Sequence, residues 1–440
     1  MKFSQYNIEH LKNGKPIWVN LRTSKWVRIS SQDVLDRINY LKETNDFSKD
    51  NPIDKAFYDR GFIVDDDFNE YEDMKQWWVN RIEENRHRLH IMVYTTDQCN
   101  FRCIYCPEEH VSRNLSNEHW NGLFNFIKNG VEKNELDEIS ICFFGGEPLL
   151  ETNKILKFLY KLDKLKKDYP NVQYFHTMTT NGYLLTPELY QELNMLGLKR
   201  YQITVDGFKE THDAARPRVD GQGTWDVVVN NLKGISILKE NLANVVIRIN
   251  SNEKIEPTLE EFYKWANETF TNEYFTFDIQ GVSNFSGNLD ENLLSKDDAA
   301  TQIKNNEIKK QYKDRRSSND FNVLTKGCMA CRTANRNCYA LLTNGTITIC
   351  EAVYMGKDTH VGKLKEDGSI EFKFDINEIY INTEYEECED CIQYPLCGGR
   401  ACPYRRLIST DVERLDCNKK DENKFLEKAR VFIETSGVFD

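Results

Sequence analysis

The chain has 440 residues, enough for two or three domains with large cores, and its 24 Phe and 21 Tyr indicate a folded rather than a disordered protein. Its formal net charge of −12 argues against a surface that wraps nucleic acid, so we expect no nucleic-acid partner. The N-terminus lacks the apolar core of a signal peptide, and no apolar run reaches the length of a membrane span. We therefore expect a cytoplasmic protein with no membrane partner.

Residues 1–86 are predicted to form a unit of their own. The runs 17–21 and 26–29 are typical of a short strand pair, and a helix follows with a capping box made by Ser30 and Asp33. A second helical segment covers 52–60, and a short strand follows at 62–64. This order predicts a small winged-helix-like module, and an extension that only caps the next domain is the alternative.

From residue 87 to residue 283, short apolar runs alternate with amphipathic helical patterns. This alternation predicts an α/β fold, a partial (β/α)6 TIM-like barrel with a parallel sheet, whose functional residues gather where the strands end. The expected strands cover 90–95, 139–144, 174–179, 200–205, 245–249 and 274–279.

Three cysteines, Cys99, Cys103 and Cys106, directly follow the first of these strands at C-x3-C-x2-C spacing. Structural zinc takes four protein ligands, whereas a [4Fe–4S] cluster held by three thiolates keeps one iron open for another ligand. The triplet therefore predicts a cluster with an open iron. Half of a zinc site, completed by distant residues, is the alternative.

Further motifs follow the next three strands. Gly145-Gly146-Glu147-Pro148 comes after the second strand, where glycines let backbone groups approach a ligand closely. Thr180-Asn181-Gly182 follows the third strand, and Thr204 lies near the end of the fourth, twelve residues before Arg216. An ordinary Asn-Gly turn is the alternative for the second motif.

With Tyr105 directly before the third cysteine, the triplet resembles the signature of radical SAM enzymes, and the later motifs resemble that family's GGEP and TNG turns. The resemblance implies that S-adenosylmethionine chelates the open iron and is cleaved reductively to a 5′-deoxyadenosyl radical. It also implies that the GGEP turn binds the methionyl amine, Thr204 the ribose and Arg216 the methionyl carboxylate. The implied cofactor-binding residues are Tyr105, Gly145, Gly146, Glu147, Asn181, Thr204 and Arg216.

Nine of the thirteen cysteines fall in the last part of the chain. A polar stretch, 284–326, is predicted to be a linker, and 327–440 to be a cysteine-rich domain with a C-terminal helix. In this domain Asn344-Gly345 predicts a hairpin between Cys338 and Cys350. The remaining lone cysteine, Cys142, lies in an apolar run and is predicted to be a buried core residue.

This late pattern resembles the SPASM domain, which carries two auxiliary [4Fe–4S] clusters, so that three clusters are implied in all. A zinc ribbon is the alternative for the C-x2-C pairs. Cys328 competes with Cys331 for the first position, and the spacing before Cys402 is one residue longer than in the family. The implied ligands are Cys331, Cys338, Cys350 and Cys402 for one cluster, and Cys388, Cys391, Cys397 and Cys417 for the other.

Together these resemblances imply a radical SAM/SPASM maturase that installs a thioether or carbon–carbon cross-link in a ribosomally made precursor peptide. The module at 1–86 resembles precursor-recognition domains, to whose sheet a leader peptide adds a strand. A flavodoxin- or ferredoxin-type protein would supply electrons. The alternatives are a sulfatase-maturase-like enzyme that makes formylglycine, and a non-catalytic metal-binding regulator.

Overall fold

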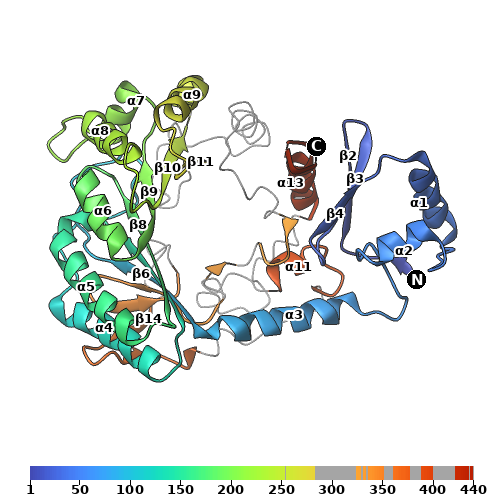
Figure 1. Ribbon diagram of the computed structural model, residues 1–440, viewed down its shortest axis with the longest axis horizontal. Helices are drawn as coiled ribbons and strands as arrows, with labels where there is room; N and C mark the ends of the chain where they lie inside the picture. The colour runs from blue at the N-terminus through green and yellow to red at the C-terminus, as the bar shows by residue number, and fades with distance from the viewer. Residues whose placement is uncertain are drawn as a thin grey trace.

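The structure is a computed structural model, and it describes residues 1–252, 254–282, 324–328, 331–332, 335–350, 360–376, 388–399, 422–435 and 437–439. A small N-terminal β module and a curved sheet covered by helices lie at opposite sides of the molecule, joined by the long helix α3 (Glu70–Glu84) (Figure 1). Most of the predicted linker, together with Cys402 and Cys417, lies outside the described residues.

Six parallel strands form the partial barrel and follow one another in chain order. They are β6 (Arg88–Tyr94), β7 (Glu138–Phe144), β8 (Gln173–Thr180), β9 (Leu198–Thr204), β10 (Asn244–Ser251) and β11 (Phe275–Gly281). The helices that cover the outer face of the sheet are α4 (Asn117–Glu132), α5 (Thr152–Asp168), α6 (Pro187–Met195), α7 (Lys209–Ala215), α8 (Trp225–Ser236) and α9 (Leu259–Thr269) (Figure 1). The predicted partial barrel is confirmed.

The barrel's main core lies between this sheet and its helices. Leu89, Ile91 and Val93 of β6 are buried there, whereas His90 and Met92 point to the inner face, as expected for side chains that alternate along a strand. Helix α5 buries the apolar stripe predicted from its spacing, namely Ile155, Phe158, Leu159, Leu162 and Leu165. Burial of such stripes is the main favourable term that holds the helices on the sheet.

The cysteine-rich region extends the sheet at the β6 edge. Strand β12 (Cys338–Leu341) pairs in parallel with β6, and β13 (Thr346–Thr348) follows in the predicted hairpin. Two further strands, β14 (His360–Leu364) and β15 (Ile370–Phe372), continue the sheet. Gly345 has φ +81° at the hairpin turn, and a side chain there would collide with the ring of His119 on α4. The turn therefore requires glycine.

The N-terminal module differs in two ways from its sequence prediction. Its sheet has three antiparallel strands rather than two: β2 (Asn7–Lys12), β3 (Lys15–Asn20) and β4 (Lys25–Arg28). The capping box is wrong, because helix α1 (Gln32–Thr44) is capped by Ser31, whose side chain makes no capping hydrogen bond. Asp33 is then the second helical residue, one position too early to close the box.

The remaining elements complete this module and the short connections. A second, two-stranded sheet joins β1 (Lys2–Phe3) to β5 (Ile63–Val64), and α2 (Pro52–Tyr58) lies between α1 and β5 in the chain. Short 3₁₀ turns cover Asn85–His87, Pro148–Glu151, Glu256–Thr258 and Gly437–Phe439. Within the described parts of the chain, no helix combines the length and the apolar composition that a membrane crossing requires.

The two faces of the three-stranded sheet are covered by different parts of the chain. One face packs on α1 and α2 through Trp18, Ile38 and Phe57. The other face packs on α3 and on residues from the end of the chain, which belong to α11 (Tyr394–Cys397), α13 (Glu422–Thr435) and the last turn. This second core contains Tyr6, Ile8, Ile17, Val19, Met74, Trp78, Tyr394, Leu396, Ile433 and Phe439.

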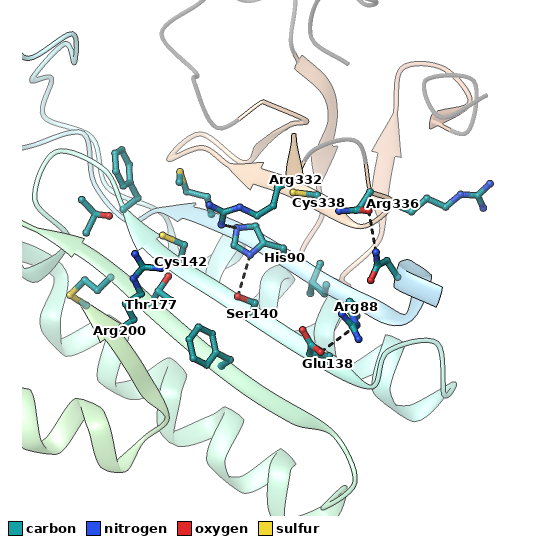
Figure 2. A pocket seen from close by; sticks show the side chains of 18 of the residues that line it. Arg88, His90, Glu138, Ser140, Cys142, Thr177, Arg200, Arg332, Arg336 and Cys338 are labelled. Atoms are coloured by element: carbon teal, nitrogen blue, oxygen red, sulfur yellow. Dashed lines mark hydrogen bonds and ion pairs between the residues drawn. The ribbon is translucent and has the colours of Figure 1, made fainter. Parts of the chain in front are cut away.

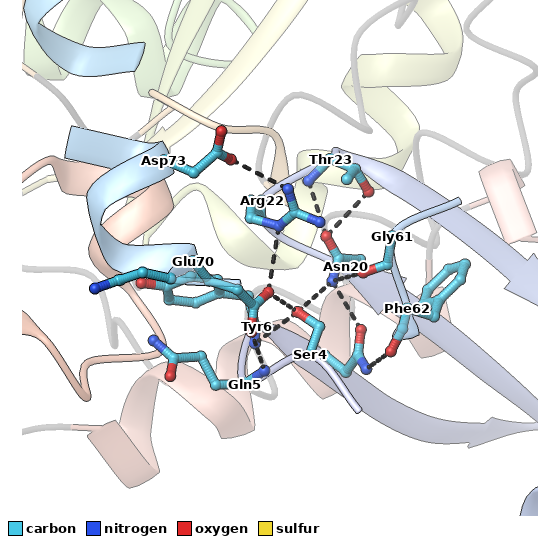
Figure 3. A network of polar contacts seen from close by, with 12 residues as sticks. Ser4, Gln5, Tyr6, Asn20, Arg22, Thr23, Gly61, Phe62, Glu70 and Asp73 are labelled. Carbon is cyan, nitrogen blue, oxygen red and sulfur yellow. Dashed lines mark hydrogen bonds and ion pairs between the residues drawn. The ribbon is translucent and has the colours of Figure 1, made fainter. Parts of the chain in front are cut away.

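A buried polar network ties the loops of the module together (Figure 3). Asn20 is fully buried, and its amide donates to Ser4 Oγ at 2.9 Å, Asn7 Oδ1 at 2.8 Å and the carbonyl of Gly61 at 3.0 Å. Its carbonyl oxygen accepts from the backbone and the hydroxyl of Thr23 at 2.8 and 3.0 Å. One amide side chain thus pairs polar groups from four separate segments.

Replacing Asn20 with Leu should destabilise the module, because several buried donors and acceptors lose their partner at once. We expect the free energy of unfolding to fall by about 3 kcal/mol, measured by urea unfolding. Asn80→Leu, on the exposed face of α3, is the matched control and should change it by less than about 0.5 kcal/mol. Equal effects of the two substitutions would contradict the role of Asn20.

Candidate active site

The three early cysteines lie on the loop that directly follows β6, at the edge of the sheet where all six parallel strands end. They line a cavity of about 310 Å³ together with side chains from the ends of β7 to β10. Of the other predicted site residues, this cavity is lined by Tyr105, Gly145, Gly146, Asn181, Thr204 and Arg216. The structure therefore brings together, around one cavity, residues that span 118 positions of the chain from Cys99 to Arg216.

The cysteine loop is held by main-chain hydrogen bonds to the segment that follows α7. The backbone N–H of Arg102 donates to Pro217 at 2.8 Å, that of Ile104 to Ala215 at 3.0 Å, and that of Val219 to Asn100 at 2.9 Å. Arg216 belongs to this paired segment, so its backbone runs beside the loop. Its distance from the cysteines is set by main-chain geometry.

The glycine pair after β7 packs directly against the start of the cysteine loop. Gly146 donates its N–H to Thr96 at 2.9 Å, and Glu147 donates to Gln98 at 2.8 Å. Gly145 has φ +126°, and a Cβ on either glycine would collide with the carbonyl oxygen of Thr96 or Gln98. The close approach that requires glycine is therefore to the cysteine loop itself, whereas the sequence prediction assigned it to the ligand.

Glu147 is fully buried, and its carboxylate does not line the cavity. It accepts hydrogen bonds from Thr180 Oγ1 at 2.7 Å, from the backbone N–H of Asn181 at 2.7 Å and from that of Leu149 at 3.0 Å. Burial raises the pKa of this carboxyl, against the lowering effect of those donors. Its side chain holds the turn at 180–182 in place. In this geometry the carboxylate therefore makes no direct contact with a ligand in the cavity.

Asn181 links the same turn to the cysteine loop. Its amide donates to Asn100 Oδ1 at 2.7 Å and lies 3.8 Å from Cys99 Sγ. Thr204, near the end of β9, is half-buried and lines the cavity. These two residues, unlike Glu147, present side chains where a bound molecule would lie.

A polar network connects Tyr105 to the ends of β9 and β10. Its hydroxyl donates to Asp206 Oδ2 and accepts from Arg216 Nη1 at 2.6 Å and from Asn250 Nδ2 at 3.0 Å. Asp206 also accepts from the backbone of Asn250 at 2.8 Å, and its own N–H donates to His212 Nδ1 at 3.1 Å. Asp206 and His212 are fully buried, so the network is shielded from water.

The charges of this network follow from burial and pairing. Burial raises the pKa of Asp206, although the nearby Arg216 lowers it. Burial opposes the charge of Arg216, but the groups around it, Cys103, Tyr105 and Asp206, raise the pKa of the guanidinium above its usual value. Arg216 is therefore a permanent cation beside the cysteine loop.

The three thiols fit a multinuclear cluster better than a single ion. Within the described residues, no three Cys, His, Asp or Glu side chains converge on one position that could hold a metal ion. Burial raises the pKa of Cys99 to about 12 and that of Cys106 to about 11, so both are protonated until a metal displaces the protons. A cluster spreads its ligands over several iron atoms, which suits three separated sulfurs on one loop.

An anionic ligand group also fits the cavity. The Nε–H of Arg216 is buried, and no described residue accepts a hydrogen bond from it. Arg216 lines the cavity, so a carboxylate there would satisfy this donor. The donor set therefore matches a cluster with an open iron and a carboxylate-bearing ligand beside it.

Sequence reasoning did not single out five further polar residues that line the cavity: Glu108, His110, Gln202, Arg248 and Asn250. Burial raises the pKa of Glu108 to about 7. Arg248 pairs with Asp278 of β11 at 3.0 Å. Arg248 and Asn250 lie near the carboxyl end of β10, and functional residues of such barrels gather at the carboxyl ends of the strands, so their position could have indicated them. Glu108 belongs to no sequence pattern that indicates a functional residue.

The later cysteines fall into two places. Cys338 begins β12, and continuing the β12–β13 register places it opposite Cys350. Cys388 and Cys391 are buried in the second core of the N-terminal module, and the half-buried Cys328 packs against the same core. Cys397 ends the short helix α11, and Cys331 is exposed.

Residues 93–262 match the Radical SAM superfamily. The radical SAM cyclopropyl synthase TigE of Paramaledivibacter caminithermalis is 31% identical over 240 residues, which cover 50% of this chain and 46% of that protein. GTP 3′,8-cyclase of Clostridium botulinum strain Hall is 36% identical over 130 residues, or 28% of this chain and 36% of that protein. The chain thus spans about half or less of the length of these two relatives.

Two solved structures share the fold. Native anSMEcpe with bound AdoMet and Kp18Cys peptide superposes with a TM-score of 0.58 at 18% identity, covering 79% of this chain and 98% of that chain. Streptococcus suis SuiB superposes with a TM-score of 0.53 at 16% identity, covering 95% of this chain and 99% of that chain. The SuiB fold accounts for more of this chain than the anSMEcpe fold does.

Replacing Tyr105 with Phe should destabilise the protein, because the buried Asp206 carboxylate loses its hydroxyl donor and Arg216 loses its acceptor. We expect the free energy of unfolding to fall by about 2 kcal/mol, measured by urea unfolding under anaerobic conditions. Tyr160→Phe is the matched control, since that residue is exposed and Glu192 is the one described partner of its hydroxyl. A Tyr105→Phe protein as stable as the control would rule out the network's contribution.

Proposed function

Since residues 93–262 make this chain a radical SAM enzyme related to the SPASM-type peptide maturases, we propose that it installs a cross-link in a ribosomally made precursor peptide. Its cofactors are S-adenosylmethionine and a [4Fe–4S] cluster. In this proposal residues 1–86 recognise the peptide, 87–283 carry the radical chemistry, 284–326 are a linker, and 327–440 hold auxiliary clusters.

The observation that carries the proposal is the convergence on one cavity of three thiols and of Arg216, whose Nε–H has no acceptor among the described residues. Cys99, Cys103 and Cys106 would hold the cluster, and Arg216 would pair with the methionyl carboxylate. When bound, the reduced cluster supplies the electron that cleaves the sulfonium and yields a radical able to take a hydrogen atom from the substrate. The chain's own task is to orient these groups and exclude water.

The other cavity residues take positioning roles in this scheme. Thr204 would contact the ribose, and the backbone of Gly145 and Gly146 would face the methionyl amine. Asn181 holds the cysteine loop through Asn100, and Tyr105 holds Arg216. Because these contacts form within the chain, the ligand would meet a site that is already ordered.

A polypeptide substrate is supported by two observations. The anSMEcpe structure with the same fold contains a bound peptide. In addition, β4 of the N-terminal module pairs with β3 on one side only, and no described strand covers its other edge. An open edge of this kind can accept a leader peptide as an added strand.

Two auxiliary [4Fe–4S] clusters belong to the proposal, with the ligand sets that the SPASM resemblance implies. Continuing the β12–β13 register places Cys338 opposite Cys350, which suits ligands of one cluster. Cys388, Cys391 and Cys397 lie on successive turns of one short segment, which suits the other. Cys402 and Cys417 lie outside the described residues.

The bond formed is proposed to be carbon–carbon or thioether. The similarity to TigE, a radical SAM cyclopropyl synthase, supports the carbon–carbon alternative, because closing a cyclopropane ring joins two carbons. A flavodoxin- or ferredoxin-type protein is proposed as the electron donor.

Replacing Cys99, Cys103 and Cys106 together with Ala should abolish SAM cleavage, because the open-iron cluster then has no protein ligands. We expect no 5′-deoxyadenosine by chromatography and a loss of about a third of the bound iron, with the auxiliary iron retained. Cys142→Ala, which removes a thiol outside the predicted ligand sets, should keep both the formation of 5′-deoxyadenosine and the full iron content. Persistent 5′-deoxyadenosine from the triple variant would refute the assignment, and its absence from the native protein would favour a regulator.

Replacing Arg28 with Pro should weaken leader binding by about tenfold, because it removes a backbone donor from the open edge of β4. Ile29 donates to Pro16 of the neighbouring strand at 2.9 Å, so the alternation of the ladder points the N–H of Arg28 away from β3. Binding is measured by fluorescence anisotropy with labelled peptides encoded by the short reading frames beside this gene. Arg28→Ala, which keeps the N–H, is the control, and equal affinities of the two variants would exclude strand addition at β4.

A further inference from the structure

The inner face of the barrel sheet encloses a second cavity, of about 620 Å³, which we call the lumen cavity (Figure 2). It begins at the starts of the strands, beside Arg88, Glu138 and Arg200, which is the end opposite the cysteine loop. Its volume is within the range of small-ligand pockets. Beyond β6 it is bounded by Arg332, Arg336 and Cys338, the first residue of β12.

The lumen cavity adjoins the cavity at the cysteine loop. Phe144, Thr179 and Gln202 line both cavities, and they come from three adjacent strands. A strand of seven residues is roughly 20 Å long. An extended chain of about six residues, entered from either end, could therefore reach from Arg200 to the cysteine loop.

The inner face of this sheet is polar along β9, whereas Met92 of β6 and Cys142 of β7 form a small apolar cluster on it. Arg200, Gln202 and Thr204 alternate along β9 with Tyr201 and Ile203, which are buried in the core between the sheet and its helices. In closed barrels of this kind, the inward side chains are bulky and apolar and fill the interior. Polar side chains around an open interior are suited to a ligand that forms hydrogen bonds.

The lumen cavity is also strongly basic, although the chain as a whole carries a net charge of −12. Among the described residues that line it, Glu138 is the only acidic one, and it pairs with Arg88 at 3.4 Å. Arg200 forms no ion pair with a described residue. The arginines that line the cavity are Arg81, Arg88, Arg200, Arg332 and Arg336.

One of these arginines is held in place by the sheet. Arg332 Nη1 donates to His90 Nε2 at 3.0 Å (Figure 2). Because a guanidinium can only donate, Nε2 is the acceptor nitrogen of the ring, and the proton is on Nδ1. His90 Nδ1 therefore donates to Ser140 Oγ at 3.2 Å. This chain of bonds fixes a cation at the cavity wall. Planar guanidinium groups bind carboxylates in a bidentate manner.

We propose that the lumen cavity binds a carboxylate-bearing segment of the polypeptide substrate and so directs the adjoining residues to the cysteine loop. The inference rests on the proposed function for the nature of the substrate. The carboxylates can come from Asp and Glu side chains or from the free C-terminus of the peptide. Arg200 is the principal contact, since it lies on the lumen face in line with Gln202 and Thr204.

The test measures binding alone, by fluorescence anisotropy on the reconstituted holoenzyme. One probe is fluorescein-labelled penta-glutamate with an amidated C-terminus, and the second is labelled penta-alanine with a free carboxylate. Labelled, amidated penta-glutamine is the uncharged control. Binding of the first probe assigns the site to acidic side chains, and binding of the second assigns it to a peptide terminus.

Arg200→Gln should raise the Kd of the bound probe about tenfold, and Arg200→Lys should raise it less, because a lysine keeps the charge but loses the bidentate geometry. Lys239→Gln, an equal loss of charge at an exposed site, should leave the Kd within about twofold of the native value. Failure of both carboxylate probes to bind, or an unchanged Kd in Arg200→Gln, would overturn the proposal. Cleavage of SAM without peptide is measured separately and should be equal in native and Arg200→Gln proteins, so a failure of the radical chemistry remains distinguishable from a failure of this site.

Discussion

The main-chain pairing between the cysteine loop and residues 215–219 is the interaction on which the candidate active site depends. It aligns two segments that are more than a hundred residues apart in the sequence. The hydrogen bonds that align them join main-chain atoms, so they do not depend on the side chains of these segments. Arg216 then needs one further contact, with the hydroxyl of Tyr105, to set the direction of its guanidinium. The buried carboxylate of Asp206 accepts from Tyr105 and balances the charge of Arg216.

A second constraint is that the two faces of the barrel sheet carry different kinds of side chain. The outer face carries the apolar core that holds the helices, and the inner face carries most of the polar side chains that line two adjoining cavities. The described strands of the cysteine-rich region extend the sheet beyond β6, and none of them pairs with β11 at the other edge. A predicted cluster ligand, Cys338, lies at the wall of the lumen cavity.

Much of the fold followed from the sequence because local patterns and tertiary packing agree. Each barrel strand is an apolar run between amphipathic helices, and the residues at the strand ends gather as parallel topology requires. Strand β2 was missed because Asn7–Lys12 carries few apolar residues, and its pairing depends on β3 and on contact with α13, which no local pattern reveals. The hydrogen bonds of Glu147 to the turn at 180–182 and the bond between Tyr105 and Asp206 could not be predicted from the sequence either, since they depend on contacts between distant segments.

The second core of the N-terminal module has a consequence for the order in which the protein folds during synthesis. Side chains such as Tyr6 and Ile17 are covered by Ile433 and Phe439, which lie more than 400 positions further along the chain. Until this later segment has been synthesised, α13 cannot dock on the apolar face of the three-stranded sheet. The N-terminal module would thus complete its core late in synthesis, after all six barrel strands have left the ribosome's catalytic centre.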